Sequence, residues 1–381
     1  MPNYSGKWTK PQQMQAIAAG TWTGVPTPEL FAWGTNSDGQ LGLGNTTNRS
    51  SPVQVGALTT WSQTASGQNH TLVTKNDGTL WAWGDNYRGA LGQGNTTDLS
   101  SPVQVGALTT WAEVAGGYLY SLATTTDGKL YAWGYNGDGQ LGLGDGTHRS
   151  SPVQVGSLTT WSKISAGYNA GYAIKTDGTL WAWGANNLGQ VGDGTTSNRQ
   201  SPVQVGALTT WAKVSGYKFS CLALKTDGTL WSWGYNPFGQ LGLGDTTNRS
   251  SPVQIGALTT WTTLGPGASR GQAIKTDGTL WVWGTDSYGA LGIESPGNQS
   301  SPVQVGALTT WLQVAGGYFF SLATTTDGKL YAWGYNAFGQ LGNGTTTSRN
   351  SPIQIGSLTT WGTLPKMSTT GSSLVTTTTT T

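Results

Sequence analysis

The residue types that could do chemistry are few in this chain and are far apart. His70 and His148 are the only histidines, so a histidine-rich metal site is excluded, and we interpret each as a surface loop residue. Cys221 is the only cysteine, which excludes an intrachain disulfide. It aligns with Ser121 and Ser321 of other repeats and has no histidine placed near it, so we expect a small packed residue and not a nucleophile.

Charged residues recur at fixed turn positions. Six of the 17 acids stand in the Asp-Gly turn that recurs every 50 residues from Asp77 to Asp327, and the others lack EF-hand spacing, so calcium binding has little support. The Gly-rich phrase QLGLG is followed neither by a helix nor by Lys-Ser/Thr, so it does not indicate a phosphate cradle. We therefore predict a protein without catalysis, cofactor or metal. A recurring arginine could form an anion-binding ring, but bonds to local carbonyls are the favoured interpretation: Arg49, Arg149, Arg199, Arg249 and Arg349.

Composition narrows the class of protein further. With 59 Gly and only 9% charged residues, a helical protein is excluded, and 20 Trp supply too much apolar surface for a disordered chain. A formal charge of +2 is too small for a nucleic-acid partner. No apolar stretch is long enough for membrane insertion, and Met1 to Trp8 lacks the pattern of a cleavable signal, so we expect a soluble chain.

The chain is built from a repeat with a period of 50 residues. The phrase SPVQVGALTTW begins at Ser51 and returns every 50 residues in identical or nearly identical form, ending with the variant SPIQIGSLTTW at Ser351. Seven copies of an aromatic-x-Trp-Gly phrase keep the same spacing. Repeats of this length made of strands and turns indicate propeller blades or another repetitive β architecture. The alternation of the strands predicts core positions between the units for Trp83, Trp133, Trp183, Trp233, Trp283 and Trp333.

Turn residues place four antiparallel strands in each unit. Asp127-Gly128 suits the tight turn of a β-hairpin. The segment 136–144 is too rich in Gly for a strand, so we expect an ordered loop in which Asn136 bonds back to the backbone. The strands expected in this unit are 114–117, 121–125, 130–133 and 152–155.

Two segments close to the phrase TDGTLWAWGxNxxGQLGxG, Thr176–Gly194 and Thr226–Gly244, resemble the repeat of the regulator of chromosome condensation family. The resemblance runs from about Ile17 to Val375 and implies an all-β fold, a seven-bladed β-propeller with four antiparallel strands per blade. Families with similar repeats include exchange factors for small GTPases, ubiquitin-ligase modules, secreted bacterial enzyme inhibitors and phage proteins. The fold alone does not choose among them.

The two ends of the chain must cooperate to close such a ring. We expect the strand around Leu374 to pair beside Leu30–Trp33, and the alternative gives that role to the N-terminal segment. The predicted organisation is an N-terminal arm with a partial repeat over 1–27, the propeller over 28–375 and a Thr-rich tail over 376–381.

Differences between the units concentrate in two connections of each blade. Because the strands alternate in direction, the first and third connections share one face of the ring, and the Asp-Gly turns lie on the other. Variable side chains on a constant framework are what a recognition surface needs, and Tyr, Phe and Arg are enriched at interface centres. The residues expected to bind a partner are Tyr87, Arg88, Tyr118, Tyr120, Tyr135, Tyr168, Lys218, Phe219, Tyr235, Phe238, Arg270, Tyr288, Tyr318, Phe319, Tyr335 and Phe338.

Two interpretations of this face remain open. Aromatic residues such as Tyr118, Tyr318 and Phe320 either bind a partner or plug the central channel. The favoured function is a non-catalytic module on a virion or cell surface, such as a phage fibre or capsid appendage, which recognises a protein or glycan and contacts other virion subunits through its N-terminal arm. The alternatives are a nucleotide-exchange factor for a small GTPase, with a cytoplasmic location, and a proteinaceous enzyme inhibitor.

Overall fold

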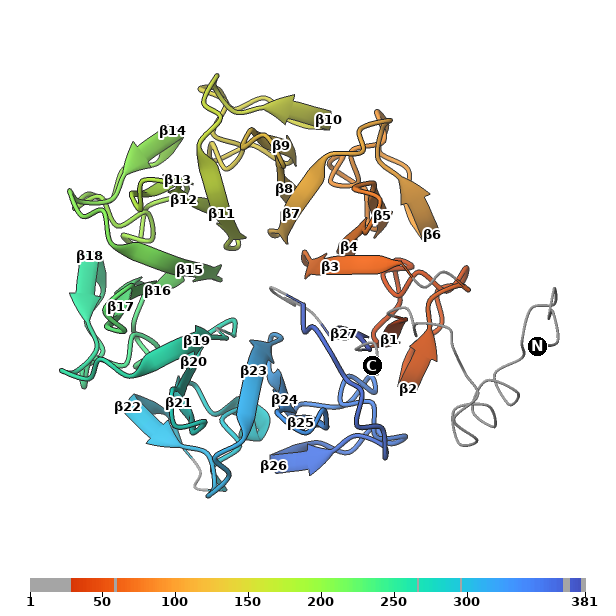
Figure 1. Ribbon diagram of the computed structural model, residues 1–381, viewed down its shortest axis with the longest axis vertical. Coiled ribbons are helices and arrows are strands. Elements are labelled where there is room, and N and C mark those ends of the chain that lie inside the picture. Colours follow the sequence, from red (N-terminus) through yellow and green to blue (C-terminus); the bar gives the residue numbers. More distant parts are fainter. Residues whose placement is uncertain (1–28, 58–59, 266, 295–296, 366–370, 378–381) are drawn as a thin grey trace, which may run out of the picture.

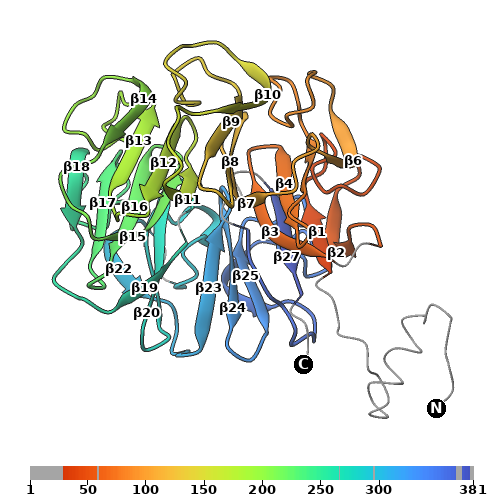
Figure 2. The same cartoon turned by 45° about the horizontal axis from the view of Figure 1, so that its top comes forward.

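Seven β-sheets stand around a central channel in a computed structural model that describes residues 29–57, 60–265, 267–294, 297–365 and 371–377 (Figure 1). Six sheets have four antiparallel strands and the seventh has three. Seen obliquely, each sheet is a blade that runs from the channel to the rim (Figure 2). The predicted seven-bladed, all-β propeller is confirmed. No helix in this described part is long and apolar enough to cross a membrane.

Within a blade the chain runs from the innermost strand to the outermost. In the blade of β7 (Trp111–Gly116), β8 (Tyr120–Thr125), β9 (Leu130–Gly134) and β10 (Arg149–Gln154), each strand pairs with the next. The inner strand starts three residues before the predicted one, and the second strand starts one residue earlier, at Tyr120. Tyr120 therefore belongs to the second strand and not to the first connection.

The other blades repeat this order of strands. The first complete blade is β3 (Trp61–Ser66), β4 (His70–Lys75), β5 (Leu80–Gly84) and β6 (Leu99–Gln104). The third and fourth are β11 (Trp161–Ala166), β12 (Ala170–Lys175), β13 (Leu180–Gly184) and β14 (Arg199–Gln204), then β15 (Trp211–Tyr217), β16 (Ser220–Lys225), β17 (Leu230–Gly234) and β18 (Arg249–Gln254). The last two are β19 (Trp261–Leu264), β20 (Arg270–Lys275), β21 (Leu280–Gly284) and β22 (Gln299–Gln304), with the 3-10 helix η1 (Ser287–Gly289), and β23 (Trp311–Gly316), β24 (Phe320–Thr325), β25 (Leu330–Gly334) and β26 (Arg349–Gln354).

The seventh blade joins the two ends of the chain. Its strands are β2 (Arg49–Gln54), β1 (Leu30–Gly34) and β27 (Ser372–Thr376), and β27 pairs with β1 from Leu30 opposite Thr376 to Gly34 opposite Ser372. Trp361 bridges Thr377 at the inner position. The predicted pairing of the strand around Leu374 with Leu30–Trp33 is confirmed. The arm expected over 1–27 lies outside the described residues, and the domain boundaries stay predictions.

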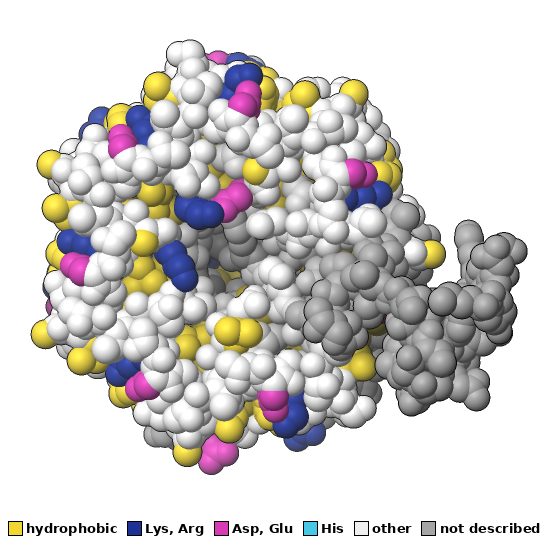
Figure 3. Space-filling model, in the orientation of Figure 1, with side chains coloured by type: hydrophobic (Ala, Val, Ile, Leu, Met, Phe, Trp, Pro, Cys, Tyr) yellow, Lys and Arg dark blue, Asp and Glu magenta, His cyan; other side chains and the backbone are white. Residues whose placement is uncertain are grey.

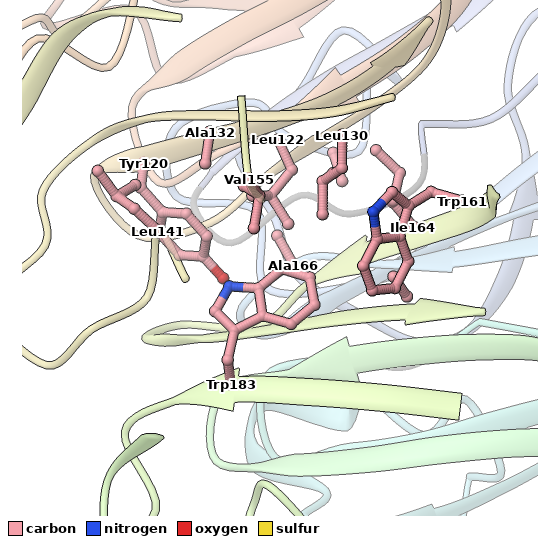
Figure 4. Close-up of a cluster of buried hydrophobic side chains, with 12 residues drawn as sticks. Tyr120, Leu122, Leu130, Ala132, Leu141, Val155, Trp161, Ile164, Ala166 and Trp183 are labelled. Carbon is pink, nitrogen blue, oxygen red and sulfur yellow. The ribbon is translucent and has the colours of Figure 1, made fainter. Parts of the chain in front are cut away.

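Tryptophans fill the space between neighbouring blades. Trp183 is completely buried, and its indole Nε1 donates to the carbonyl oxygen of Gln140 at 2.9 Å. It belongs to a buried cluster that also contains Leu122 and Leu141 of one blade and Ile164 of the next (Figure 4). The same burial holds for Trp33, Trp83, Trp133, Trp233, Trp283 and Trp333, so the predicted core role of the tryptophan series is confirmed.

The turn and loop predictions also hold. Gly128 has φ +77°, a conformation that L side chains rarely adopt, and an added Cβ would lie 2.2 Å from the Thr159 oxygen. Asn136 is fully buried; its Oδ1 accepts from the Leu141 N–H at 2.9 Å, and its Nδ2 donates to the Asp145 oxygen at 2.8 Å. One asparagine in each of six units, and Asp286 in the other, therefore fixes the conformation of the Gly-rich loop by accepting from the backbone N–H five residues later.

Three of the five recurring arginines, Arg149, Arg199 and Arg249, bond within their own loops, to an aspartate and in two cases also to a local carbonyl. Arg149 Nη2 lies 2.7 Å from Asp145 Oδ2, and its Nη1 donates to the Thr147 oxygen at 2.8 Å. Arg199 reaches an aspartate at a different position of its loop, and its Nε lies 2.6 Å from Asp193 Oδ2. Each pair fixes its own loop.

Candidate functional site

The first and third connections meet on one face, which we call the loop face. Within single blades, the ring of Phe219 lies 6.1 Å from that of Tyr235, and the ring of Phe319 lies 6.4 Å from that of Tyr335. Between blades, Tyr288 lies 5.3 Å from Phe319. These contacts join residues of the two connections, so the geometry deduced from strand direction is confirmed.

Side chains from several blades converge at the centre of the loop face. Tyr118 and Tyr168 stack with ring centroids 4.0 Å apart, and Tyr168 lies 5.6 Å from Phe219. Burial and then a hydrogen bond with Tyr118 raise the pKa of Tyr168 above its ordinary value. Lys218 Nζ contacts the Tyr318 hydroxyl, although these residues lie two blades apart. These aromatic residues thus contact one another while staying partly exposed, and their role in binding a partner stays a prediction.

A second group of aromatic residues extends outward over the last two complete blades. Tyr288 is 57% exposed, and its ring lies 4.6 Å from that of Tyr335. Tyr318 and Phe319 contact edge to face at 4.6 Å, and Phe338, 47% exposed, lies 6.2 Å from Tyr335. We call Tyr288, Tyr318, Phe319, Tyr335 and Phe338 the aromatic cluster.

A pocket of about 400 Å³ opens beside the aromatic cluster. Aromatic side chains form one part of its lining, and polar groups of Thr35, Gln68, Asn69 and Gln340 form another. Sequence reasoning did not single out these polar residues. Gln68 and Asn69 stand in a variable first connection and could have been included, whereas Gln340 belongs to the repeated phrase and carried no signal.

The remaining candidates lie elsewhere on the loop face. Tyr87 is 64% exposed, and the Arg88 guanidinium carbon lies 4.5 Å from its ring and 5.8 Å from that of Tyr135. Phe238 is 41% exposed. Burial, opposed by the Tyr87 backbone hydrogen bond, raises the pKa of the neighbouring Asp85 carboxyl. The part of the loop face around Tyr87 thus carries the charged residues Asp85 and Arg88, whereas the aromatic cluster contains no charged residue.

Seven matches to one family model run along the propeller, and a typical match covers the two outer strands of one blade and the two inner strands of the next. That model, "Regulator of chromosome condensation (RCC1) repeat", matches residues 29–74, 77–124, 127–174, 177–223, 227–265, 277–324 and 327–362. The chain belongs to the RCC1-repeat family. As an RCC1-repeat protein it has the fold that the sequence resemblance implies, a ring of seven blades.

Solved structures with the same propeller cover nearly all of this RCC1-repeat chain. Human WBSCR16 is 20% identical with a TM-score of 0.83, covering 93% of this chain and 100% of its own. Yeast RCC1 (Prp20) bound to Kap60 is 21% identical with a TM-score of 0.83, covering 93% and 90%. Prp20p from Saccharomyces cerevisiae, a protein described with binding properties to Gsp1p and histones, is 22% identical with a TM-score of 0.82, covering 94% and 93%. At these identities the likeness shows the fold alone.

These matches correct the location expected from the sequence. The virion or cell-surface location is wrong, because the RCC1-repeat structures that match over nearly their full length include one bound to Kap60 and one described with binding to Gsp1p and histones.

Two predicted partner-binding residues of the RCC1-repeat face are buried instead. Tyr120 is completely buried, and its hydroxyl donates to the Ala170 oxygen at 2.7 Å in the next blade. Arg270 is also completely buried, and its guanidinium donates to the carbonyl oxygens of Tyr318 and Gly317 at 3.1 Å and to that of Phe320. Each is the first residue of a second strand and points between blades, so neither can touch a partner.

The same strand position explains two further corrections. His70, expected in a surface loop, is 1% exposed, and its Nε2 lies 3.0 Å from Ser121 Oγ. Burial lowers the pKa of His70 to about 4. Phe320, considered as a channel plug, is buried between blades. His148 stays in its loop, where Nδ1 accepts from the Asn136 N–H at 3.0 Å.

Other chemistry has little support in the described part of the chain. Cys221 is fully buried, burial raises its pKa, and its prediction as a packed residue is confirmed. Among the described residues no group of three His, Cys, Asp or Glu is placed to hold a metal ion. The opposite face, drawn in Figure 3, carries charged side chains in pairs near the rim and beside the central hollow. In the turn at Asp127, Lys129 pairs with that aspartate at 2.8 Å, and between neighbouring blades Lys163 pairs with Glu113 at 2.9 Å.

Proposed function

We propose that this RCC1-repeat protein is a non-catalytic module that binds a partner protein through its loop face. One observation carries the proposal: non-identical aromatic side chains gather on one face of a ring whose other parts are repeated. Tyr288, Phe338 and Tyr87 are each more than half or nearly half exposed there. Exposed aromatic residues beside partly buried ones resemble the centres of protein interfaces, where Tyr and Phe supply contact area at low entropic cost.

The partner-binding residues of the proposal are the exposed and half-buried members of the sequence-based set. Tyr120 and Arg270 are removed from it because both are buried. Three groups remain, which are the aromatic cluster, the central residues Tyr118, Tyr168, Lys218 and Phe219, and the outer residues Tyr87, Arg88, Tyr135, Tyr235 and Phe238.

A small GTPase is the partner class to test first. The family resemblance implies exchange factors for small GTPases, and the similar Prp20p is described with binding to Gsp1p. An exchange factor must disturb the nucleotide site of its partner, and Lys218 at the centre of the loop face is a charged group in position to contribute. Binding without exchange is the broader form of the same proposal.

The face is tested by site-specific photocrosslinking in the native cell. A photoreactive phenylalanine analogue replaces Tyr335 or Phe238 on the loop face, and Leu158 or Leu308 on the Asp-Gly face; all four side chains are partly or largely exposed. We expect one discrete protein adduct from the loop-face positions and none from the leucine positions. Adducts from the leucine positions alone would contradict the proposal.

Exchange activity is tested separately with a panel of purified small GTPases loaded with a fluorescent guanine nucleotide. Accelerated release by the wild type, abolished in Tyr335→Ser with Lys218→Ala and retained in Leu158→Ser, is the result expected of an exchange factor. Unchanged release across the panel would limit the function to binding.

A further inference from the structure

We propose that the pocket beside the aromatic cluster binds an uncharged, proline-containing extended segment of a partner protein. This inference rests on the proposed function and adds the chemistry of the bound segment. A pocket of about 400 Å³ is within the range of sites for small ligands and accommodates a few side chains of an extended chain. The surrounding aromatic residues would hold the remainder of the partner.

The lining of the pocket determines the chemistry of the segment. Tyr168, Tyr318, Phe319, Tyr335 and Phe338 supply aromatic walls, and none of the described residues that line the pocket is charged. The Lys218 ammonium lies outside the lining and is bonded to the Tyr318 hydroxyl, so a charged group entering the pocket would lose hydration without gaining an opposite charge from the lining itself. The pocket is therefore complementary to an uncharged segment.

Polar groups occupy the other part of the lining. The amides of Gln68, Asn69 and Gln340 and the hydroxyl of Thr35 accompany the apolar rings, so the pocket combines flat apolar surfaces with groups of the type that donates hydrogen bonds. A polyproline II segment fits this combination because its rings pack on aromatic side chains and its backbone carbonyls are free to accept. A regular helix or sheet strand has its carbonyls already bonded.

Arg270 supports the aromatic cluster from beneath. Its guanidinium, completely buried, donates to the carbonyl oxygens of Gly317, Tyr318 and Phe320, which bracket the two aromatic residues of that connection. Burial lowers the pKa of Arg270 to about 9, so it remains a cation near neutral pH. We assign Arg270 as a positioning residue that fixes Tyr318 and Phe319 before a partner arrives, which reduces the entropic cost of binding.

Tyr288 carries a second sign of specialisation in this sector. It has φ +61°, whereas at the described φ > 0 positions of the other six blades the residue is glycine. A non-glycine residue in this conformation costs on the order of 1 kcal/mol and persists where the surroundings enforce it. Its ring is nevertheless 57% exposed. The strained backbone thus presents an aromatic ring at the edge of the cluster.

The test measures fluorescence anisotropy with labelled synthetic peptides. The probe is a short neutral peptide of repeating Pro-Pro-Leu, and the matched control has Gly in place of each Pro. Wild type is compared with Phe319→Ala, Tyr335→Ala and the control Leu158→Ala, whose side chain lies on the Asp-Gly face and is 44% exposed. Melting of each variant is recorded. We expect binding of the proline peptide, weakened about tenfold or more by the pocket variants and unchanged by Leu158→Ala.

Arg270→Phe tests the positioning role, since Phe320 occupies the corresponding place in the next blade. We expect weaker peptide binding at temperatures where this variant is fully folded. Unchanged affinity in the folded variant would overturn the positioning role.

The outcomes separate this inference from the proposed function. Equal affinity for the Pro and Gly peptides, or no affinity for either, overturns the inference, while crosslinking at Tyr335 would leave the protein-binding function standing. A neutral oligosaccharide, maltoheptaose, is titrated in parallel. If it binds with the same sensitivity to Phe319→Ala and the peptide does not, the pocket is a glycan site and the inference is wrong.

Discussion

The two faces of the propeller use the same backbone in opposite ways. On the Asp-Gly face, Asp177 Oδ1 accepts from the Thr179 N–H at 2.9 Å and from its hydroxyl at 2.6 Å, and Trp181 Nε1 donates to that hydroxyl. The same bonds recur in the turns at Asp77, Asp227 and Asp277. On the loop face the bonds of Asn136 and its equivalents also repeat, but neighbouring positions of the first and third connections carry different side chains. Repeated bonds therefore stabilise the ring, and the loop face is left free to diverge.

This division predicts that stability and recognition respond to different substitutions. Changes between the blades should lower the free energy of unfolding, and changes in the aromatic cluster should affect binding alone. The substitutions below run from the largest expected loss of stability to the smallest.

Trp183→Ala should cost roughly 3–5 kcal/mol of unfolding free energy, because it leaves a cavity between two blades. The Gln140 carbonyl oxygen also loses its indole donor. Urea unfolding followed by circular dichroism measures the loss. A cost below about 1 kcal/mol would contradict the assignment of the tryptophans as the main core between blades.

His70 should make stability fall in mild acid. Burial lowers its folded pKa to about 4 from 6.5, so between those values the unfolded chain binds a proton that the folded chain does not. The contribution is fully present above pH 6.5 and is lost as pH falls toward 4, on the order of 2–3 kcal/mol. Unfolding at about pH 7 and about pH 4.5 should show a smaller decrease for His70→Phe than for the wild type. An equal decrease in both proteins would place the effect elsewhere.

Arg149→Ala tests a bond confined to one loop. Its contact with Asp145 is partly exposed, with 27% and 41% of the two side chains accessible, so we expect a change of about 0–1 kcal/mol. Thermal melting of this variant beside Trp183→Ala checks the contrast. A loss as large as that of the tryptophan variant would mean that the loop arginines hold the ring together.

Much of the fold could be predicted because every unit carries the same turn residues and the same core positions. Asp-Gly pairs marked hairpins, and alternation in LYAW-like phrases placed Trp133 and its equivalents in the core. The site was harder to predict. Tyr120 and Arg270 stand beside variable loop residues in the sequence, yet each begins a strand whose first side chain points between blades.

The buried position that begins each second strand, and the contacts between distant blades, could not be recognised from the sequence. The place taken by Tyr120 is filled by His70, Ala170, Ser220, Arg270 and Phe320 in other units, and all of them are buried. Such a range of types at one buried position resembles surface variation when only the sequence is known. Likewise, Lys218 and Tyr318 lie 100 residues apart, and only the curvature of the ring brings them together.

The most direct measurement compares stability and partner affinity in one double variant, Tyr335→Ala with Phe338→Ala. The partner identified by crosslinking is titrated against this variant and the wild type, and urea unfolding is measured on the same samples. We predict an unfolding free energy within about 0.5 kcal/mol of the wild type and an affinity about tenfold or more lower. Unchanged affinity, or a loss of affinity explained by unfolding, would contradict the division between a repeated framework and a binding face.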